Sequence, residues 1–488
     1  MSLRAPEFLA VLSFCLLPAT SSDAARPAKP NILFIMVDDL GKEWIGCYGA
    51  EGIQTPNLDK LAEGGMRFEN AWCMPQCTPT RVTLLTGQYP FRHGWTNHWD
   101  VPRWGAKCHF DPKLNNSFAL ILRKAGYATC AAGKWQIDDF RVEPRAMDEA
   151  GFDEWCMWTG YETGNPPSGN RYWDAYINTP EGSKTYEGEF GPDVYCDYLI
   201  DFMRRNKDKP MLLYFPMALT HGPLTTTPDE PDAPKDEQHR AMVRYTDKLV
   251  GKLVNELDRL GIREDTIVIF TTDNGTGGKT NMRNGHLVKG AKARMVEAGT
   301  AMPFIVNCPG RVPAGVVTDA LTDFTDMLPT FAELAGAKLP DQHVVDGKSI
   351  AKLILGKAKD SDRQWIMSMG GGAGTIRDGR VAPKLDYDDR VIRDKRFKLW
   401  VGTDRKPSRL YDMIADPWEQ NDLLGSTDPD AVAARKELET VVTTFPGKDG
   451  WPRYTDNPPQ AWDRKEGGSR KGDPRKKRDR KAKENKAD

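Results

Sequence analysis

The sequence predicts an α/β protein with a large, mostly parallel mixed sheet sandwiched by helices and a smaller C-terminal α+β subdomain. Three continuous apolar runs support this fold class, at residues 31–37, 211–215 and 266–270. Such runs are typical of strands that are buried on both faces of a parallel sheet. Segments with helical periodicity lie between them, and this alternation favours a sheet that is covered by helices on both sides.

The remaining elements follow from local signals. Pro56 opens a helix and Gly64 stops it, and Gly261 follows a long amphipathic helix. Between residues 152 and 190 the periodicity fades into Gly, Pro, Trp and Tyr, which indicates a long insertion over one face. Beyond about residue 346 the elements become short and amphipathic. The predicted helices span about 56–62, 78–85, 117–124, 236–260 and 325–334, and further strands span 127–132 and 303–307.

Four segments are predicted along the chain of 488 residues. An N-terminal basic residue, a short apolar stretch and small residues up to Ala25 are typical of a secretory signal peptide. From Asp463 to Asp488 there are twelve Lys or Arg and six Asp or Glu residues, with no aromatic or large aliphatic residue, which indicates a solvated tail rather than a nucleic-acid-binding segment. The segments are a signal peptide at 1–25, a catalytic domain at 26–345, a C-terminal subdomain with a small antiparallel sheet at 346–455, and a disordered basic tail at 456–488.

Export is therefore the expected fate of the chain, to the periplasm or the extracellular space. No segment after the signal approaches eighteen consecutive apolar residues, so no transmembrane anchor is expected. Removal of the signal with Cys15 leaves eight cysteines. Export would permit disulfides, but no C-x-x-C pair or zinc-ligand spacing occurs and the pattern does not reveal which cysteines would pair.

The stretch from Cys77 to Gly87 has an unusual composition. Thr78 is a suitable N-cap and Pro79 suits the first helical position, so Cys77 is expected just before a helix N-terminus. Free amides and the helix dipole favour an anion there, and Arg81 adds a charged donor about one turn later. A buried or disulfide-bonded cysteine before an ordinary helix is the alternative interpretation.

Polar side chains follow four of the predicted strands. Because ligands of open α/β sheets bind beyond the carboxyl ends of the strands, these side chains are expected to converge. One set offers only oxygen ligands, which suits a hard divalent cation; its members are Asp38, Asp39, Asp273 and Asn274. The other set is cationic and suits a tetrahedral oxyanion; its members are Arg81, Lys134, His221 and Lys292.

These residues and the motifs around them, taken in their order along the chain, resemble those of the type I sulfatases of the alkaline-phosphatase superfamily. The resemblance covers residues 31 to about 423. The strongest match is Cys77-Thr78-Pro79-Thr80-Arg81 with Leu84-Leu85-Thr86-Gly87, which is similar to the modification signature of that family. Supporting matches are Val37-Asp38-Asp39, Gly133-Lys134-Trp135, Thr220-His221, Tyr245-Thr246-Asp247, Thr272-Asp273-Asn274-Gly275, Lys292 five residues before Glu297, Asp326-Met327-Leu328-Pro329-Thr330, and Leu410-Tyr411-Asp412 with Asp416-Pro417.

The resemblance implies that Cys77 is oxidised by a formylglycine-generating enzyme to 3-oxoalanine (formylglycine), whose hydrate is the nucleophile. It implies one divalent cation, with Ca²⁺ favoured over Mg²⁺. The metal ligands would be Asp38, Asp39, Asp273, Asn274 and the modified Cys77, and Arg81 would stabilise the hydrate while Lys134, His221 and Lys292 hold the sulfate. A hydrate can expel sulfate by returning to the aldehyde, whereas a thiol cannot.

Gln136 departs from the family pattern, which usually has Gly-Lys-Trp-His where this chain has Gly133-Lys134-Trp135-Gln136. The histidine of the family is assigned to the deprotonation that releases sulfate, and a glutamine cannot act as a base at neutral pH. His286 or the Asp138-Asp139 pair are candidate replacements, and slow turnover is the other explanation. Thr80, where serine or alanine is more usual, is a minor departure.

The expected activity is hydrolysis of sulfate esters in a sulfated carbohydrate. Nine of the fourteen tryptophans lie within the first 173 residues, and aromatic faces stack on sugar rings as well as packing in cores. Two alternatives stay open at this point. One is a phosphomonoester or phosphonate monoester hydrolase of the same fold. The other is a sulfated-glycan binding protein with impaired turnover.

Overall fold

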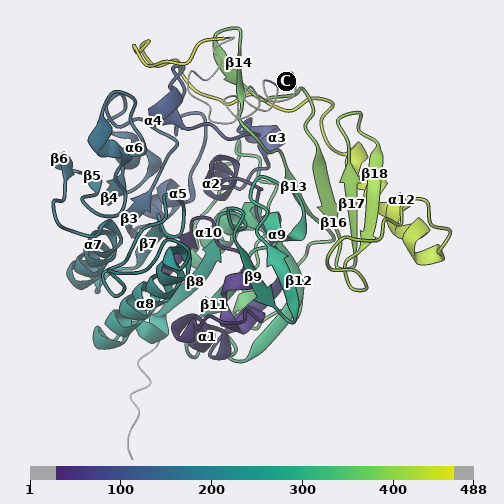
Figure 1. The fold of residues 1–488 in the computed structure, drawn as a ribbon, viewed down its shortest axis with the longest axis horizontal. Helices are drawn as coiled ribbons and strands as arrows, with labels where there is room; N and C mark the ends of the chain where they lie inside the picture. The colour runs from purple at the N-terminus through teal and green to yellow at the C-terminus, as the bar shows by residue number, and fades with distance from the viewer. Residues whose placement is uncertain (1–28, 467–488) are drawn as a thin grey trace, which may run out of the picture.

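The computed structural model of the protein describes residues 29–466 (Figure 1). These residues form a ten-stranded sheet, a four-stranded sheet and two small hairpins, with helices around them. The fold class expected from the sequence is confirmed. The expected signal peptide at 1–25 and residues 467–488 of the expected tail lie outside the described residues.

Strand β1 (Asn31–Val37) lies in the middle of the ten-stranded sheet and is buried along its whole length. Its neighbours, β8 (Thr266–Thr272) and β7 (Met211–Pro216), both run parallel to it, and β3 (Ala128–Lys134) runs parallel to β7. Four parallel strands therefore end side by side. The full order is β12-β2-β11-β8-β1-β7-β3-β4-β5-β6, where the outer strands are β12 (Val316–Asp323), β2 (Met66–Trp72), β11 (Phe304–Asn307), β4 (Glu154–Trp158), β5 (Tyr176–Thr179) and β6 (Gly182–Thr185).

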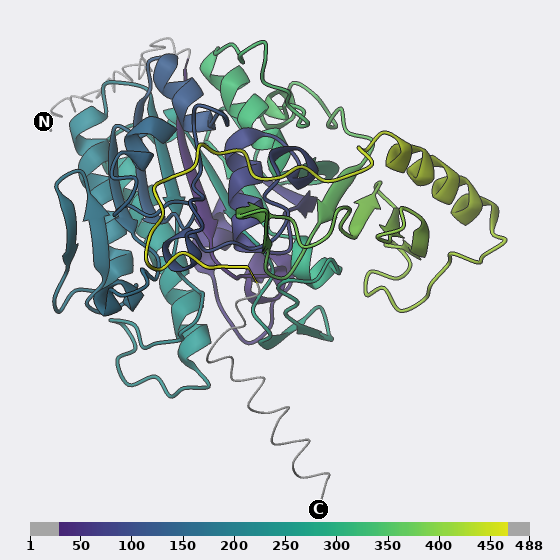
Figure 2. The same ribbon diagram turned by 90° about the horizontal axis from the view of Figure 1, so that it is seen from above.

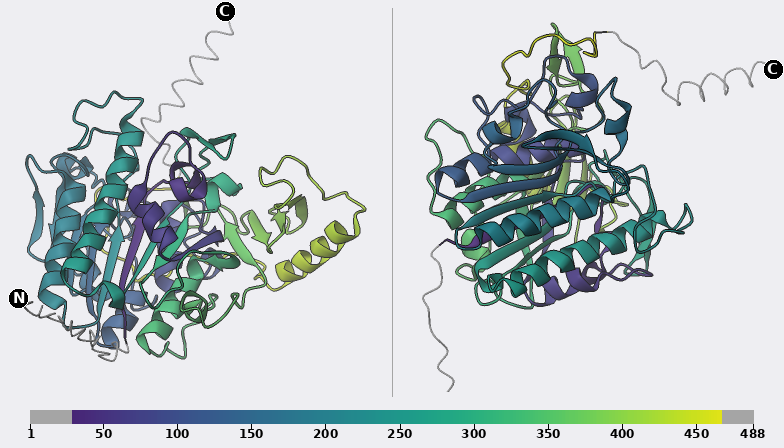
Figure 3. Two further views of the ribbon diagram at one scale, coloured as in Figure 1. Left: turned by 90° about the horizontal axis from the view of Figure 1, so that it is seen from below. Right: turned by 90° about the vertical axis from the view of Figure 1, so that its left-hand side faces the viewer.

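Alternate side chains of β1 enter two separate hydrophobic cores, one on each face of the sheet. Full burial of a large aliphatic or aromatic side chain stabilises a fold by about 1.5–3 kcal/mol, so both layers hold this strand in register. Figure 2 shows the layers from above, and in Figure 3, right, the two long helices α7 and α8 lie across one face. That face packs on α1 (Pro56–Glu63), α7 (Gly191–Asn206) and α8 (Gln238–Arg259); the other packs on α2 (Cys77–Thr86), α5 (Phe118–Lys124), α6 (Ala146–Ala150), α10 (Met327–Ala335) and α11 (Ala351–Ile354).

Two parts of the sheet differ from the expectation, and a third has a direction that the sequence did not predict. Residues 152–190 do not form an insertion over one face, because they supply β4, β5 and β6 and extend the sheet at its edge. These strands are only four or five residues long and are separated by Gly- and Pro-rich turns, which hides their periodicity. Strand β2 was not expected at all. The expected strand at 303–307 is present as β11, but it runs antiparallel to both of its neighbours.

Helix α2 starts at Cys77, two residues earlier than expected from Thr78 as the N-cap. Gln76 is the N-cap residue and its side chain makes no capping hydrogen bond. Every residue of the helix is buried, and Gly87 ends it in the left-handed conformation with φ 66°. Glycine adopts this conformation without the steric cost that a Cβ would add. Cys77 therefore lies inside the first turn of a fully buried helix.

A four-stranded antiparallel sheet forms the C-terminal part, with its own hydrophobic core and with α12 (Pro429–Thr443) at its outer side (Figures 1 and 2). Its strands are β13 (Ile366–Met369), β16 (Arg390–Arg393), β17 (Phe397–Val401) and β18 (Pro407–Asp412). The remaining short elements are α3 (Pro90–His93), α4 (Val101–Trp104), α9 (Glu297–Thr300), the hairpins β9 (Thr280–Arg283) with β10 (His286–Lys289) and β14 (Thr375–Arg377) with β15 (Arg380–Ala382), and the 3₁₀ turns η1 (Lys42–Trp44), η2 (Gly46–Tyr48), η3 (Pro166–Gly169), η4 (Arg263–Asp265) and η5 (Phe324–Asp326).

Part of the expected basic tail is packed against the body of the protein. Asp463 accepts a hydrogen bond of 2.8 Å from the backbone amide of Ala106, and the amide of Asn457 donates to the carbonyl of Lys107. Residues 456–466 are thus held by the segment around Gly105, and the ordered chain continues past residue 455. Within residues 29–466 none of the eight cysteines forms a disulfide, and no helix has the length and apolar character to cross a membrane.

Candidate active site

The functional side chains meet at the carboxyl ends of β8, β1, β7 and β3. These strands are neighbours in the sheet, and the last residue of β1, Val37, pairs with Thr272, the last residue of β8. Side chains that follow the two strands are therefore brought together although 234 positions separate Asp39 from Asp273. Asp38 and Asp39 follow β1, Asp273 and Asn274 follow β8, Lys134 ends β3 and His221 lies five residues after β7.

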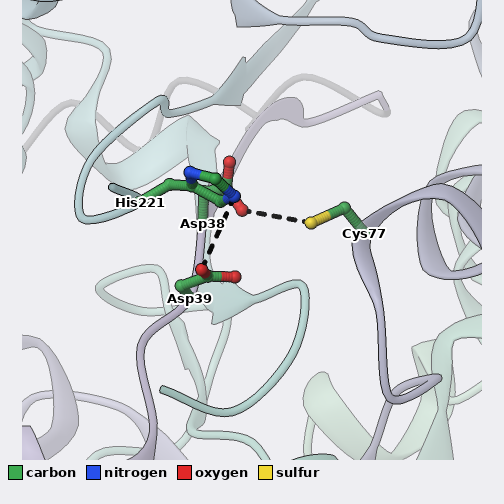
Figure 4. A group of neighbouring side chains, drawn as sticks. All are labelled: Asp38, Asp39, Cys77 and His221. Carbon is green, nitrogen blue, oxygen red and sulfur yellow. Dashed lines mark hydrogen bonds and ion pairs between the residues drawn. The ribbon is translucent and has the colours of Figure 1, made fainter. Parts of the chain in front are cut away.

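Helix α2 places Cys77 at the same point. Its Sγ atom lies 3.4 Å from Oδ1 of Asp38 and 3.4 Å from Nζ of Lys292. Figure 4 shows the thiol pointing from the helix towards the two aspartates. Among the described residues, a group of four offers ligand atoms that all lie within 4.8 Å of one another: Asp38, Asp39, Cys77 and His221.

Each carboxylate at this point is paired with a cation. Lys134 Nζ lies 2.5 Å from Oδ2 of Asp38, and Lys292 Nζ lies 2.6 Å from Oδ1 of Asp39. Arg81 Nη2 donates to Oδ2 of Asp273 over 2.8 Å. Hydrogen bonds between charged partners are about twice as strong as neutral ones, and they are what makes burial of so many charges tolerable.

Asp38 is a buried carboxylate that is surrounded by cationic groups. Burial alone would raise the pKa of this carboxyl, but Lys134, His221 and Arg81 outweigh burial and hold the pKa well below its usual range. Burial and the neighbouring negative charge of Asp38 raise the pKa of Asp273. Burial, with Asp273 and Asp38, also raises the pKa of the Cys77 thiol. As encoded, Cys77 is a neutral thiol, whereas a nucleophilic cysteine has to be a thiolate.

Asn274 completes the oxygen-rich side of the site. Its Nδ2 donates to Oδ1 of Asp39 over 2.7 Å, while its buried Oδ1 accepts no hydrogen bond from any residue between 29 and 466. A buried amide oxygen without a donor costs free energy unless another electropositive group satisfies it. Carboxylate and amide oxygens of this kind suit Ca²⁺ or Mg²⁺, so the residues present fit a hard divalent cation.

His221 connects the site to the 152–190 segment. Its Nε2 lies 3.7 Å from Oδ2 of Asp39, and its Nδ1 lies 3.0 Å from Nη1 of Arg171. Burial lowers the pKa of His221 to about 4 despite the nearby Asp38 and Asp39. The guanidinium of Arg171 also lies 3.9 Å from the ring of Trp158, so an aromatic face holds a cation beside the site.

Sequence reasoning missed two residues at the edge of the site, Arg171 and His98. Both lie in segments without periodicity, and only the surplus of aromatic residues around them is a signal. His98 contacts the hydroxyl of Thr78 at 3.0 Å, next to Cys77 in the chain. Its imidazole lies close enough to Lys292, Lys134 and His221 for their charges, after burial itself, to lower its pKa well below 6.5.

The replacements that were considered for the usual histidine at Gln136 make contacts elsewhere. Asp138 accepts hydrogen bonds from Nε1 of Trp135 and from the amide of Phe110, and Asp139 is paired with Arg141. His286 is exposed on β10, where its ring lies against Trp418. Gln136 itself is buried, has a positive φ of 75°, and its Oε1 accepts no hydrogen bond.

Taken together, the site gathers oxygen ligands for a cation and fixed cationic side chains around Cys77. Such an arrangement binds a tetrahedral oxyanion next to a metal and stabilises negative charge that develops on a leaving oxygen. Hydrogen bonds and ion pairs connect all nine residues that the sequence predicted for the site.

The family model described as Sulfatase matches residues 30–337 of the chain. An ulvan-active sulfatase of Formosa agariphila is 29% identical over 467 residues, which cover 88% of this chain and 85% of that protein. An N-acetylgalactosamine-6-sulfatase of Canis lupus familiaris is 31% identical over 358 residues, covering 68% of this chain and 67% of the relative.

Solved structures show the same fold. The crystal structure of Ps i-CgsB superposes with a TM-score of 0.72 at 24% identity, covering 87% of this chain and 95% of that one. The PsFucS1 sulfatase from Pseudoalteromonas sp. superposes with a TM-score of 0.65, also at 24% identity, covering 86% and 92% of the two chains. At this level of identity the likeness concerns the fold.

Proposed function

This chain belongs to the sulfatase family of the alkaline-phosphatase superfamily and is a sulfuric-ester hydrolase, and we propose that it is exported and removes sulfate from sulfated carbohydrate with a formylglycine derived from Cys77. Two relatives support the substrate class, since one is named for activity on ulvan and the other for a sulfated amino sugar. The position of Cys77 supports its assignment as the precursor of the nucleophile, because it lies in the first turn of α2 and contacts both Asp38 and Lys292.

The burial of Cys77 explains why the residue has to be modified. A buried neutral thiol that is surrounded by carboxylates is a poor nucleophile. A hydrated aldehyde at the same position carries two hydroxyl groups. One attacks sulfur, and loss of the proton of the other expels sulfate and restores the aldehyde. A formylglycine-generating enzyme is the partner that this modification requires during maturation.

The metal would be held by Asp38, Asp39, Asp273, Asn274 and the modified side chain of Cys77, with Ca²⁺ favoured over Mg²⁺. The partnerless Oδ1 of Asn274 and the carboxylates on either side of it support this set. When bound, the cation would polarise the sulfate oxygens and lower the pKa of the attacking hydroxyl. Lysines now paired with Asp38 and Asp39 would then be free to turn towards sulfate.

The remaining side chains have roles that follow from their contacts. Arg81 is fixed to Asp273 and to the backbone carbonyl of Lys134, so its charge is held beside the nucleophile. Lys134, Lys292 and His221 come from three different segments of the chain and would hold the three non-bridging oxygens of the sulfate group. Arg171 contacts His221 at 3.0 Å and so adds a further cation beside the proposed sulfate position.

Two measurements test the proposed function. The first is mass spectrometry of the peptide that contains Cys77, from protein made through an export pathway together with a formylglycine-generating enzyme. We expect the mass of the aldehyde or its hydrate, and an unmodified thiol in active protein would overturn the proposed nucleophile. The second is sulfate release from a panel of sulfated oligosaccharides, with Cys77→Ala as the inactive control. Faster cleavage of matched phosphate esters would overturn the substrate class.

A further inference from the structure

The segment that carries His98 passes both Thr78 and Gln136. The amide of Val101 donates to the carbonyl of Gln136 at 3.3 Å. The backbone of His98 is fixed on both sides, because its amide donates to the carbonyl of Gly372 at 2.9 Å and its carbonyl accepts from Gly374 at 3.0 Å. The imidazole of His98 is therefore held in place next to the residue that follows Cys77.

The hydrogen bonds of Thr78 determine which nitrogen of His98 carries the proton. Thr78 has one hydroxyl proton, and it donates this proton to the carbonyl of Trp99 at 3.1 Å. Among the described residues Thr78 supplies the hydrogen bond of that buried carbonyl, and buried carbonyls are rarely left without one. The contact of 3.0 Å between Thr78 Oγ1 and His98 Nδ1 is then donated by the imidazole. In a neutral imidazole this leaves a lone pair on Nε2.

The surroundings keep His98 neutral before a substrate binds. Burial, Lys292, Lys134, His221 and Arg103 all lower its pKa. A neutral imidazole with its proton on Nδ1 can accept a proton at Nε2 but cannot donate one from it. His98 is therefore suited to act as a base and not as an acid. Binding of an anion beside Lys292 and Lys134 offsets their charges, so it raises the affinity of His98 for a proton when the proton has to be taken up.

The other side chains around Cys77 are less suited to accept a proton. Lys292 is a cation whose pKa is raised, after the opposing effect of burial, by Cys77 and Asp39. His221 already contacts Asp39 with one nitrogen and Arg171 with the other. A glutamine side chain such as that of Gln136 is not a base in the pH range of enzymes.

We propose that Nε2 of His98 accepts the proton in the step that releases sulfate, in the place that Gln136 does not fill; this rests on the proposed function. In that step the O–H bond of the second hydroxyl on the modified Cys77 breaks and the proton moves to Nε2. The electron pair of that bond forms the carbonyl of the aldehyde, and the bond between the same carbon and the sulfate oxygen breaks. Sulfate leaves with the electron pair of that carbon–oxygen bond.

The kinetic test uses 4-nitrophenyl sulfate, because nitrophenol leaves in the first step and sulfate in the second. We expect His98→Asn to release about one equivalent of nitrophenol rapidly and then to turn over about 10²- to 10⁴-fold more slowly than the unaltered enzyme. Mass spectrometry of the stalled variant should find sulfate covalently attached to the Cys77 peptide. His286→Asn, an exposed histidine on β10, is the matched control and should behave as the unaltered enzyme.

A second measurement does not depend on a variant. In the unaltered protein, NMR of the His98 imidazole should show a proton on Nδ1, and addition of inorganic sulfate should raise its pKa. Equal loss of the fast and slow phases in His98→Asn, or an Nε2–H tautomer, would overturn the role of His98. If the unaltered enzyme carries no modified Cys77, the proposed function itself fails, and the two failures are thus distinguishable.

Discussion

Nη2 of Arg81 donates a hydrogen bond of 2.8 Å to Oδ2 of Asp273, 192 positions away in the chain. Nη1 of the same guanidinium donates to the carbonyl of Lys134 at 2.9 Å. Arg81 thereby attaches helix α2 to the ends of two strands, β8 and β3. Because both charged groups are buried, this attachment determines where the start of α2, and with it Cys77, lies relative to the carboxylates.

We expect Arg81→Lys to lower kcat/KM by about 10²-fold or more. A lysine has the charge but lacks the planar fork that serves two acceptors, and one donor beside a developing charge is worth about that factor. The measurement is steady-state kinetics with thermal unfolding in parallel. Arg92→Lys is the control, since Arg92 is paired with Asp346 near the surface, and comparable kinetics for both variants would contradict the prediction.

Removal of divalent cations should abolish activity, and Ca²⁺ should restore more of it than Mg²⁺. Because the cation binds the folded state, Ca²⁺ at a hundred times its dissociation constant should raise the free energy of unfolding by about 2.7 kcal/mol. Activity and unfolding midpoint are measured after chelation and after addition of each ion. In Asn274→Ala the gain in stability should be reduced. Full activity in protein shown by elemental analysis to hold no metal would refute the site.

Arg363→Ala should lower the free energy of unfolding by about 3–5 kcal/mol, because it leaves two buried carboxylates without their cation. The guanidinium of Arg363 contacts Asp323 and Asp326, which are fully buried, and Tyr89. Urea unfolding measures the loss. Arg396→Ala removes a half-exposed arginine that is paired with Asp412 and should lower the free energy of unfolding far less, because water screens an exposed ion pair. Equal losses in the two variants would mean that burial of the pair does not matter.

His239 should make the protein less stable in acid. Its ring is buried against Trp44, neither nitrogen has a hydrogen-bond partner, and burial followed by Lys279 lowers its pKa from 6.5 to about 4. Between these two values the unfolded chain binds a proton that the folded chain does not. The free energy of unfolding therefore falls by about 1.4 kcal/mol per pH unit as the pH decreases from 6.5 towards 4.

His239→Phe removes this dependence while keeping a ring against Trp44. Urea unfolding of both proteins is measured at several pH values across that range. As the pH falls, the free energy of unfolding of the variant should rise relative to that of the unaltered protein. Because all other titrating groups are common to both proteins, the difference isolates His239. A difference that stays constant with pH would contradict the buried, neutral imidazole.

Much of the fold was predictable because buried parallel strands leave a local pattern. The strand at 31–37 and the helix at 117–124 are present as β1 and α5, and Ser117 caps the latter by accepting from the amide of Leu120. Short edge strands leave no such pattern. The Gly- and Pro-rich residues 152–190 therefore concealed β4, β5 and β6, and the direction of β11 was not readable from its three apolar residues.

The amino-acid sequence by itself determined which side chains stand at the ends of buried strands, and so nominated Asp38, Lys134 and Asp273 for the site. Tertiary structure alone decided the pairing of these residues and the recruitment of His98, which has no motif of its own. The physical reason is the range of the interactions. Periodicity and capping act over a few neighbouring residues, whereas the pairing of β1 with β8 and the contact between Thr78 and His98 depend on how distant segments pack.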